Sequence, residues 1–156
     1  MEAFLAALEA TVVADYLRGA RWGYAAVNAT HIFGIALLIG AILPLDLRLL
    51  GLWSGVPRTA LVGVLSPVAA TGLAIAVCAG IMLFSVRARE YADLDVFRLK
   101  LFFISLGGLS ALAVHWWYGA RLERNGGAPL IGPALISITC WLGALICGRL
   151  IAFVIT

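Results

Sequence analysis

Four long stretches of this chain carry no Asp, Glu, Lys or Arg, and this feature constrains the fold more than any other. In chain order they contain 24, 28, 20 and 24 residues and lie at 22–45, 59–86, 101–120 and 125–148. A helix of about 20 apolar residues crosses a hydrocarbon layer ~30 Å thick. Charged residues make up only 12% of the chain, against about 25% in soluble domains. The sequence therefore predicts an integral membrane protein with four helical spans.

The connections between these stretches are short, which predicts how the spans are arranged. Consecutive helices joined by short loops are antiparallel neighbours, so we expect an all-α, up-down four-helix bundle that forms a single membrane domain over residues 1–156. Pro44 is expected to bend the first span, and a polar loop is expected at 87–95. The spans are expected at about 22–45, 59–86, 97–118 and 130–153.

The segment ahead of the first span has the pattern of an amphipathic helix. Phe4, Leu8, Val12 and Tyr16 recur every four residues, and the acidic residues lie outside this stripe. Helices of this kind lie on the membrane with one face in the headgroup region. We therefore expect one interfacial helix over about residues 2–18.

The spans also indicate the surroundings of the protein. Its partner is a lipid bilayer, and we expect a multi-pass protein of the cell's inner (plasma) membrane. The net charge is +3, but the basic residues flank the spans and form no patch, so nucleic-acid binding is not expected. A homo-oligomer is compatible with these patterns.

The chain has two histidines, and both fall within predicted spans. Ionisable side chains inside a bilayer are costly and mark functional positions, and histidine is a common ligand of haem iron and of copper. We therefore predict that His31 is a metal or haem ligand. His115 lies beside two tryptophans at the end of the third span, where it is a second ligand, a separate site or an interfacial residue.

Further polar or charged residues also fall within the spans or at their ends. They are Asn28, Asp46, Arg48, Arg98 and Arg149. Asp46 and Arg48 are two residues apart and do not face each other on a helix. If Asp46 is buried, we expect it to reach Arg149 or a residue on another helix. The alternative is an interfacial pair of charges at the end of the span.

The third span carries a stripe of residues on one helix face. Its members are Lys100, Ile104, Gly108, Ala111 and His115, which are spaced by 4, 4, 3 and 4 residues. Because glycine removes side-chain volume, the groove at Gly108 suits either a flat macrocycle or a closely packed neighbouring helix. Gly34, three residues after His31, offers a similar notch on the first span.

The candidate ligands differ in depth. His31 lies nine residues after Trp22, whereas His115 lies eighteen residues after Phe97, and the two spans run in the same direction. At 1.5 Å per residue, their depths differ by ~13 Å. The sequence therefore favours His31 as an axial ligand of a haem near the N-terminal side, with Lys100 on the same side to meet a propionate. One haem held by both histidines is the weaker hypothesis.

Several motifs carry a resemblance to known families. The segments at His31–Gly40, Asp46–Gly51, Phe97–Leu101 and Gly148–Ala152 resemble a family of small four-span bacterial membrane proteins of undefined function, over nearly the whole chain. The chain is more loosely similar to CopD-type copper-resistance membrane proteins and HemJ-type protoporphyrinogen oxidases. They share a histidine near the start of one span and a Phe/Val-x-x-Lys opening of another. This resemblance implies that His31 is a haem or metal ligand and Lys100 its companion.

Together these patterns favour a membrane protein that binds haem b and passes electrons within the bilayer, to or from a quinone. One alternative is a cofactor-free structural or assembly subunit of a larger membrane complex, which would explain the small residues on the helix faces. A third is copper handling through His31, His115 and the three cysteines. Whether the isolated chain has enzymatic turnover is left open.

Overall fold

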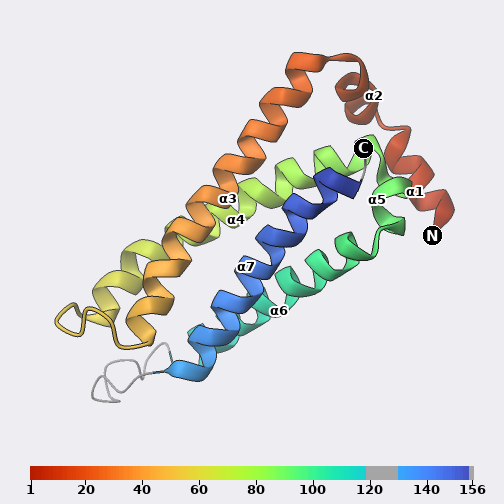
Figure 1. The fold of residues 1–156 in the computed structure, drawn as a ribbon. Coiled ribbons are helices and arrows are strands. Elements are labelled where there is room, and N and C mark those ends of the chain that lie inside the picture. The colour runs from red at the N-terminus through yellow and green to blue at the C-terminus, as the bar shows by residue number, and fades with distance from the viewer. Residues whose placement is uncertain (119–129, 155–156) are drawn as a thin grey trace.

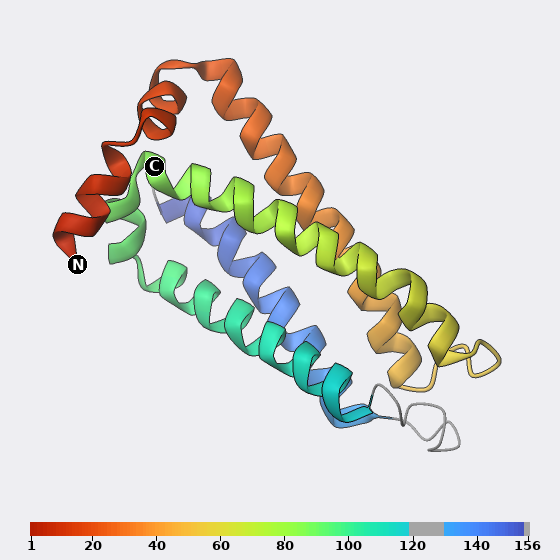
Figure 2. The same ribbon diagram turned by 180° about the vertical axis from the view of Figure 1, so that it is seen from behind.

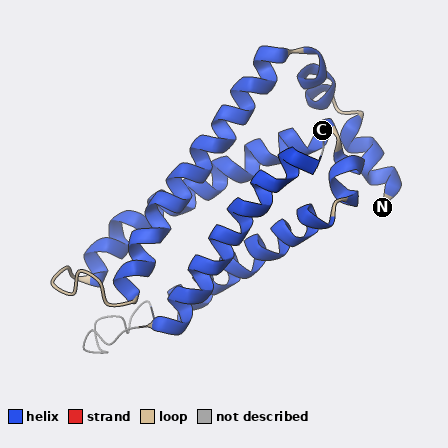
Figure 3. Cartoon of the chain, viewed as in Figure 1, coloured by secondary structure: helices blue, strands red, loops and turns tan. Residues whose placement is uncertain are grey.

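The computed structural model describes residues 1–118 and 130–154, apart from the side chains of residues 115, 117 and 118. Every regular element in this part of the chain is a helix (Figure 3). The helices are α1 Glu2–Glu9, α2 Val12–Gly19, α3 Arg21–Leu49, α4 Arg58–Val86, α5 Ala88–Asp93, α6 Asp95–Tyr118 and α7 Ile131–Val154. Helices α3, α4, α6 and α7 are long and apolar enough to cross a membrane. The prediction of an all-α membrane protein with four spans is therefore confirmed.

The four spanning helices run up and down and form two close pairs, α3 with α4 and α6 with α7, as Figures 1 and 2 show. The pairs are joined where α3 also contacts α7. Helices α4 and α6 follow one another as spans, but no Cα atoms of the two come within 8 Å among the described residues. The expectation that every consecutive pair of spans packs closely is wrong at this position: the two helices meet through the stacked rings of Phe84 and Phe97, whose centroids are 5.2 Å apart.

Glycines set the closest approach between α3 and α4. A Cβ atom on Gly34 would lie only 2.6 Å from the backbone nitrogen of Ala76, and one on Gly72 only 2.6 Å from that of Leu38. The two backbones are therefore in direct contact, as small residues allow between membrane helices. The notch predicted at Gly34 is filled by α4, which corresponds to the neighbouring-helix alternative.

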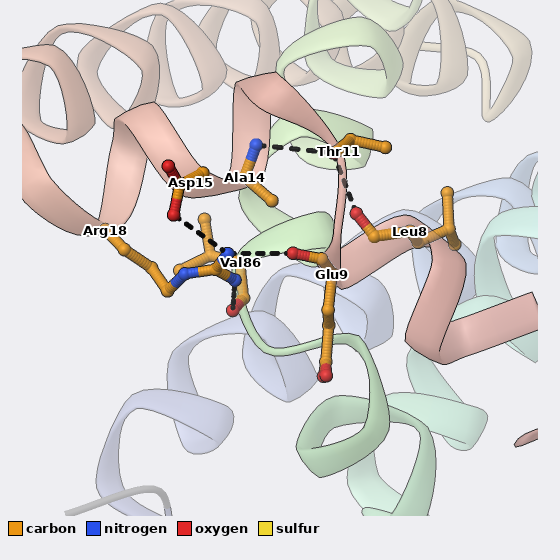
Figure 4. Close-up of polar contacts among 7 residues, drawn as sticks. All are labelled: Leu8, Glu9, Thr11, Ala14, Asp15, Arg18 and Val86. Carbon is orange, nitrogen blue, oxygen red and sulfur yellow. Dashed lines mark hydrogen bonds and ion pairs between the residues drawn. The ribbon is translucent and has the colours of Figure 1, made fainter. Parts of the chain in front are cut away.

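The N-terminal segment forms two helices, so the prediction of one helix over residues 2–18 is wrong. The hydroxyl of Thr11 donates to the carbonyl of Leu8 at 2.7 Å and accepts from the amide of Ala14 at 3.3 Å, which ends α1 and caps α2 (Figure 4). Such a cap stabilises a new helix start by about 1 kcal/mol. The chain consequently turns at Ala10 and Thr11.

This turn changes which face of the segment is buried. Leu5, Ala14 and Leu17 pack inside, where at most 8% of each residue is exposed. Phe4 and Tyr16 of the predicted stripe are instead exposed, at 66% and 63%. Helices α1 and α2 pack on α4, and α1 also packs on α5, at one end of the bundle (Figures 1 and 2).

Helix α5 replaces most of the polar loop predicted at 87–95. An ion pair between Glu9 and Arg89 joins α5 to α1. The Glu9 carboxylate accepts from the backbone amide of Arg89 at 2.9 Å and from its Nε at 2.8 Å. Hydrogen bonding to Arg89 lowers the pKa of Glu9, and the same contact raises the pKa of Arg89. Arg18 adds a bond to the Glu9 carbonyl at 2.8 Å (Figure 4).

Helix α3 continues through Pro44 to Leu49, beyond the predicted end of the span near residue 45. Arg48, in its last turn, is buried and donates to the carbonyls of Val56 at 2.8 Å and Ser54 at 3.1 Å. These bonds fix the connection to α4. Asp46 and Arg48 are both buried within the bundle, at the end of the span.

Candidate cofactor site

The four spanning helices line a partly open cavity of about 370 Å³, which we call the central cavity. All four helices contribute to its lining, and most lining residues are apolar, including Ile35, Leu38, Leu73, Val77 and Ile104. Its volume falls within the ~300–1,000 Å³ typical of small-molecule sites. Three lining residues carry polar groups: His31, Lys100 and Trp141. These groups determine what the cavity can bind.

His31 of α3 is held by the backbone of α4. Its Nδ1 lies 2.7 Å from the carbonyl oxygen of Ala76. Because a carbonyl only accepts hydrogen bonds, Nδ1 carries the hydrogen and Nε2 keeps its lone pair in the neutral ring. Gly80 makes room for the ring, since a Cβ there would lie 3.1 Å from Cε1 of His31. Metal-binding histidines commonly have this arrangement, with one ring nitrogen bonded to a carbonyl and the other free for the metal.

Lys100 of α6 lines the same cavity as His31. No carboxylate of the described residues lies within ion-pair distance of its ammonium group. The end of its side chain lies beside Gly148 of α7, where an added Cβ would be 3.6 Å from Nζ. An unpaired ammonium within a membrane span is costly, so this position favours a ligand that carries negative charge.

Trp141 of α7 is the third residue with a polar group in the lining of the central cavity, and it was not among the predicted site residues. The residue is 5% exposed, and its indole Nε1–H is buried with no hydrogen-bond partner among the described residues. Gly107 of α6 lies against this edge of the indole, since a Cβ there would be 3.1 Å from Cε2 of Trp141. Nothing in the sequence distinguishes this tryptophan from one that only packs in the core.

A second space of about 310 Å³, which we call the outer cavity, lies against the same two polar residues. It shares His31, Gly80, Phe84, Phe97 and Lys100 with the central cavity. Its other lining residues include Tyr24, Asn28 and Tyr91. Burial is the main cause that raises the pKa of Tyr91, and a hydrogen bond with Tyr24 adds to it. His31 and Lys100 therefore lie between an apolar space and a more polar one.

The structure does not bring the other predicted site residues to this cavity. Gly108 is absent from its lining, and no atom lies within 4 Å of a Cβ built there. The side chain of His115 is outside the described residues, but its place in α6 is fifteen residues after Lys100, a separation of about 22 Å along the helix.

Copper ligands do not cluster in the part of the chain that the structure describes. Within residues 1–118 and 130–154, no group of three or more His, Cys, Asp or Glu side chains is placed to hold a metal ion. The thiols of Cys78, Cys140 and Cys147 are free. The central cavity thus offers a metal one imidazole. A single protein ligand suits a metal that is already held by a macrocycle, because the macrocycle supplies most of the ligands.

No family model, curated protein sequence or solved structure matches this chain. Its function is therefore inferred from the chemistry of the cavity. That chemistry combines a largely apolar space between the four spanning helices with one imidazole and one ammonium group that, among the described residues, has no carboxylate within ion-pair distance. It suits an apolar ligand that bears both a metal and negative charge.

Proposed function

We propose that this protein binds haem b in the central cavity and passes electrons within the membrane. The observation that carries the proposal is that His31, whose Nδ1 is bound to the Ala76 carbonyl, and Lys100 line the same largely apolar cavity. Haem b has an apolar ring, an iron that binds imidazole and two carboxylate groups. Each feature has a counterpart in the cavity.

Each polar residue of the cavity has a distinct part in holding the haem. His31 would hold the haem iron through Nε2, while the carbonyl of Ala76 fixes the orientation and tautomer of the ring. Lys100 would meet a propionate, and the ring of Trp141 would pack against the haem. When bound, the haem supplies one-electron chemistry. The residues around it exclude water and set its potential through burial and hydrogen bonding.

A lipid-soluble quinone is the partner we propose for this electron transfer. It shares the bilayer with the four spans and needs no aqueous route to the protein. We place the protein in the inner (plasma) membrane on the same reasoning, because membrane-bound quinones and haem proteins work together there. The competing hypothesis, a cofactor-free subunit of a larger complex, accounts for the backbone contact at Gly34 and Gly72 but gives His31 and Lys100 no role.

The test is an absorbance spectrum of protein purified from haem-replete cells. We expect a Soret band and about one iron per chain in the wild type. His31→Ala should lose most of the band. The matched control, His115→Ala, should keep it, because residue 115 lies about 22 Å along α6 from Lys100. A folded wild type without a Soret band, or a band unchanged in His31→Ala, would contradict the proposal. A stable protein partner in mild detergent, with no cofactor, would support the structural subunit instead.

A further inference from the structure

A third cavity, separate from the central and outer cavities, lies at the opposite end of the bundle, where α3 ends and α4 begins. This polar cavity has a volume of about 130 Å³ and is lined by all four spanning helices. Its polar lining residues are Asp46, Arg48, Arg58, Ser66, Ser110 and Ser137. None of them takes part in the proposed haem site.

Asp46 carries an unmet hydrogen-bonding demand. Only 4% of the residue is exposed. A hydrogen bond links its carboxyl group to the side chain of Ser137, but oxygen Oδ2 is buried with no partner among the described residues. A buried carboxylate oxygen left without a donor is costly. The cavity therefore favours a ligand with an O–H or N–H group.

Two cations that could answer Asp46, Arg48 and Arg149, are engaged elsewhere. Arg48 lines the cavity, but its Nε and Nη2 donate to the carbonyls of Val56 and Ser54. Arg149, a partner expected for Asp46, instead lies with its guanidinium 4.8 Å from the ring of Phe153, in the last turns of α7. Asp46 is thus buried beside α7 without Arg149.

The size of the cavity and the route into it narrow the ligand class. An engineered protein cavity of about 150 Å³ holds a benzene molecule, so about 130 Å³ has room for one six-membered ring. Ile42, Leu61 and Val114 provide apolar walls. Helices α4 and α6 both line the cavity, yet none of their described Cα atoms come within 8 Å of each other. The cavity reaches the surface of the bundle at Ala111 of α6, which lines it and is exposed, so a ligand dissolved in the bilayer has a route to it.

We propose that the polar cavity binds the head group of a quinol, with one ring hydroxyl donating to Oδ2 of Asp46. This inference rests on the proposed function, in which a quinol is the electron donor, and it assigns a place to that partner. Ser137 of the polar cavity and Trp141 of the central cavity are four residues apart on α7, about 6 Å along the helix. The two cavities therefore adjoin along α7, although Asp46 itself lies fifteen residues after His31 on α3, about 22 Å along that helix.

The test is equilibrium dialysis of the purified full-length protein in detergent, with hydroquinone and 1,4-difluorobenzene as probes, each a single six-membered ring. The wild type should bind hydroquinone about tenfold or more tightly than 1,4-difluorobenzene, because only hydroquinone has O–H groups to donate to a buried carboxylate. Asp46→Asn should reduce this preference to about threefold or less. The control, Asp15→Asn, changes an exposed carboxylate on α2 and should keep the full preference.

A second variant decides the matter if Asp46→Asn fails to fold. Ala111 lines the cavity and is exposed, so Ala111→Leu should fill the space and weaken binding of both probes about tenfold. Equal affinity for both probes in the wild type, no binding at all, or full binding by Ala111→Leu would overturn the inference. Quinol binding without a Soret band would overturn only the haem proposal, and a Soret band without quinol binding would overturn only this one.

Discussion

Substitution of Gly34 by alanine is expected to force α3 and α4 apart. The added Cβ would lie 2.6 Å from the amide nitrogen of Ala76 and 2.8 Å from the carbonyl oxygen of Gly72. Both are backbone atoms of a continuous helix, so neither can move away by changing a rotamer. The distance to Ala76 must grow from 2.6 Å to at least 3.4 Å, an increase of about 0.8 Å before ordinary van der Waals contact is restored.

The energetic cost follows from this displacement. Overpacking of this kind costs about 1–3 kcal/mol, whereas replacing glycine by alanine within a helix gains about 1 kcal/mol. Gly40→Ala, on the same helix, is the matched control, because no atom lies within 4 Å of a Cβ built there. The difference in unfolding free energy between the two variants isolates the clash, and we expect it to be about 1–3 kcal/mol.

Unfolding in mixed micelles, titrated with a denaturing detergent and followed by circular dichroism, measures this difference. A second effect is expected at His31, since the displaced residue is the one whose carbonyl accepts from Nδ1 at 2.7 Å. The NMR signal of the Nδ1 proton should shift or broaden in Gly34→Ala and remain in Gly40→Ala. Equal stability of the two variants, with the proton signal unchanged, would refute the backbone contact.

Three further expectations concern other contacts. Glu9→Gln should speed hydrogen exchange in α1. In the wild type the lowered pKa of Glu9 means that its carboxylate is ionised at neutral pH and fully holds α1 on α5. This docking weakens as the pH falls below 4.5, the ordinary pKa value. Protection of α1 that does not fall with pH in the wild type would contradict the pairing with Arg89. Thr11→Val should destabilise the start of α2 by about 1 kcal/mol, with Thr11→Ser close to wild type by the same exchange measurement. Gly143→Ala should destabilise the α6–α7 pair less than Gly34→Ala, because its Cβ would meet the ring of Phe103 at 2.8 Å, a side chain that can rotate; equal losses in detergent unfolding would show otherwise.

The spans were predictable because their signal is local. An uncharged stretch of 20 or more residues has few alternatives to a membrane helix, and each predicted stretch contains most of one observed helix. The break at Thr11 was missed because a hydrophobic stripe repeats every four residues on both sides of it. One side-chain cap decided the outcome there. The separation of α4 from α6 depends on contacts between distant segments, which a single sequence does not reveal.

The site was predictable in part for a similar reason. His31 and Lys100 stand out because each is an ionisable residue in an apolar span, and counting residues from the span starts placed them on one side of the membrane. The bond from His31 to Ala76 could not be predicted, because it depends on how α3 crosses α4. The burial of Asp46 was also hidden, since a charged residue near the end of a span is typical of the membrane interface.

The most direct test of the haem proposal is the identity of the atom bound to iron. Protein purified with its haem from cells grown on nitrogen-15 histidine can be studied by electron–nuclear hyperfine spectroscopy. Coordination through Nε2 of His31 predicts a nitrogen-15 coupling at the iron that persists in His115→Ala and vanishes in His31→Ala. An iron centre with no histidine coupling, or a coupling that survives the loss of His31, would contradict the proposal.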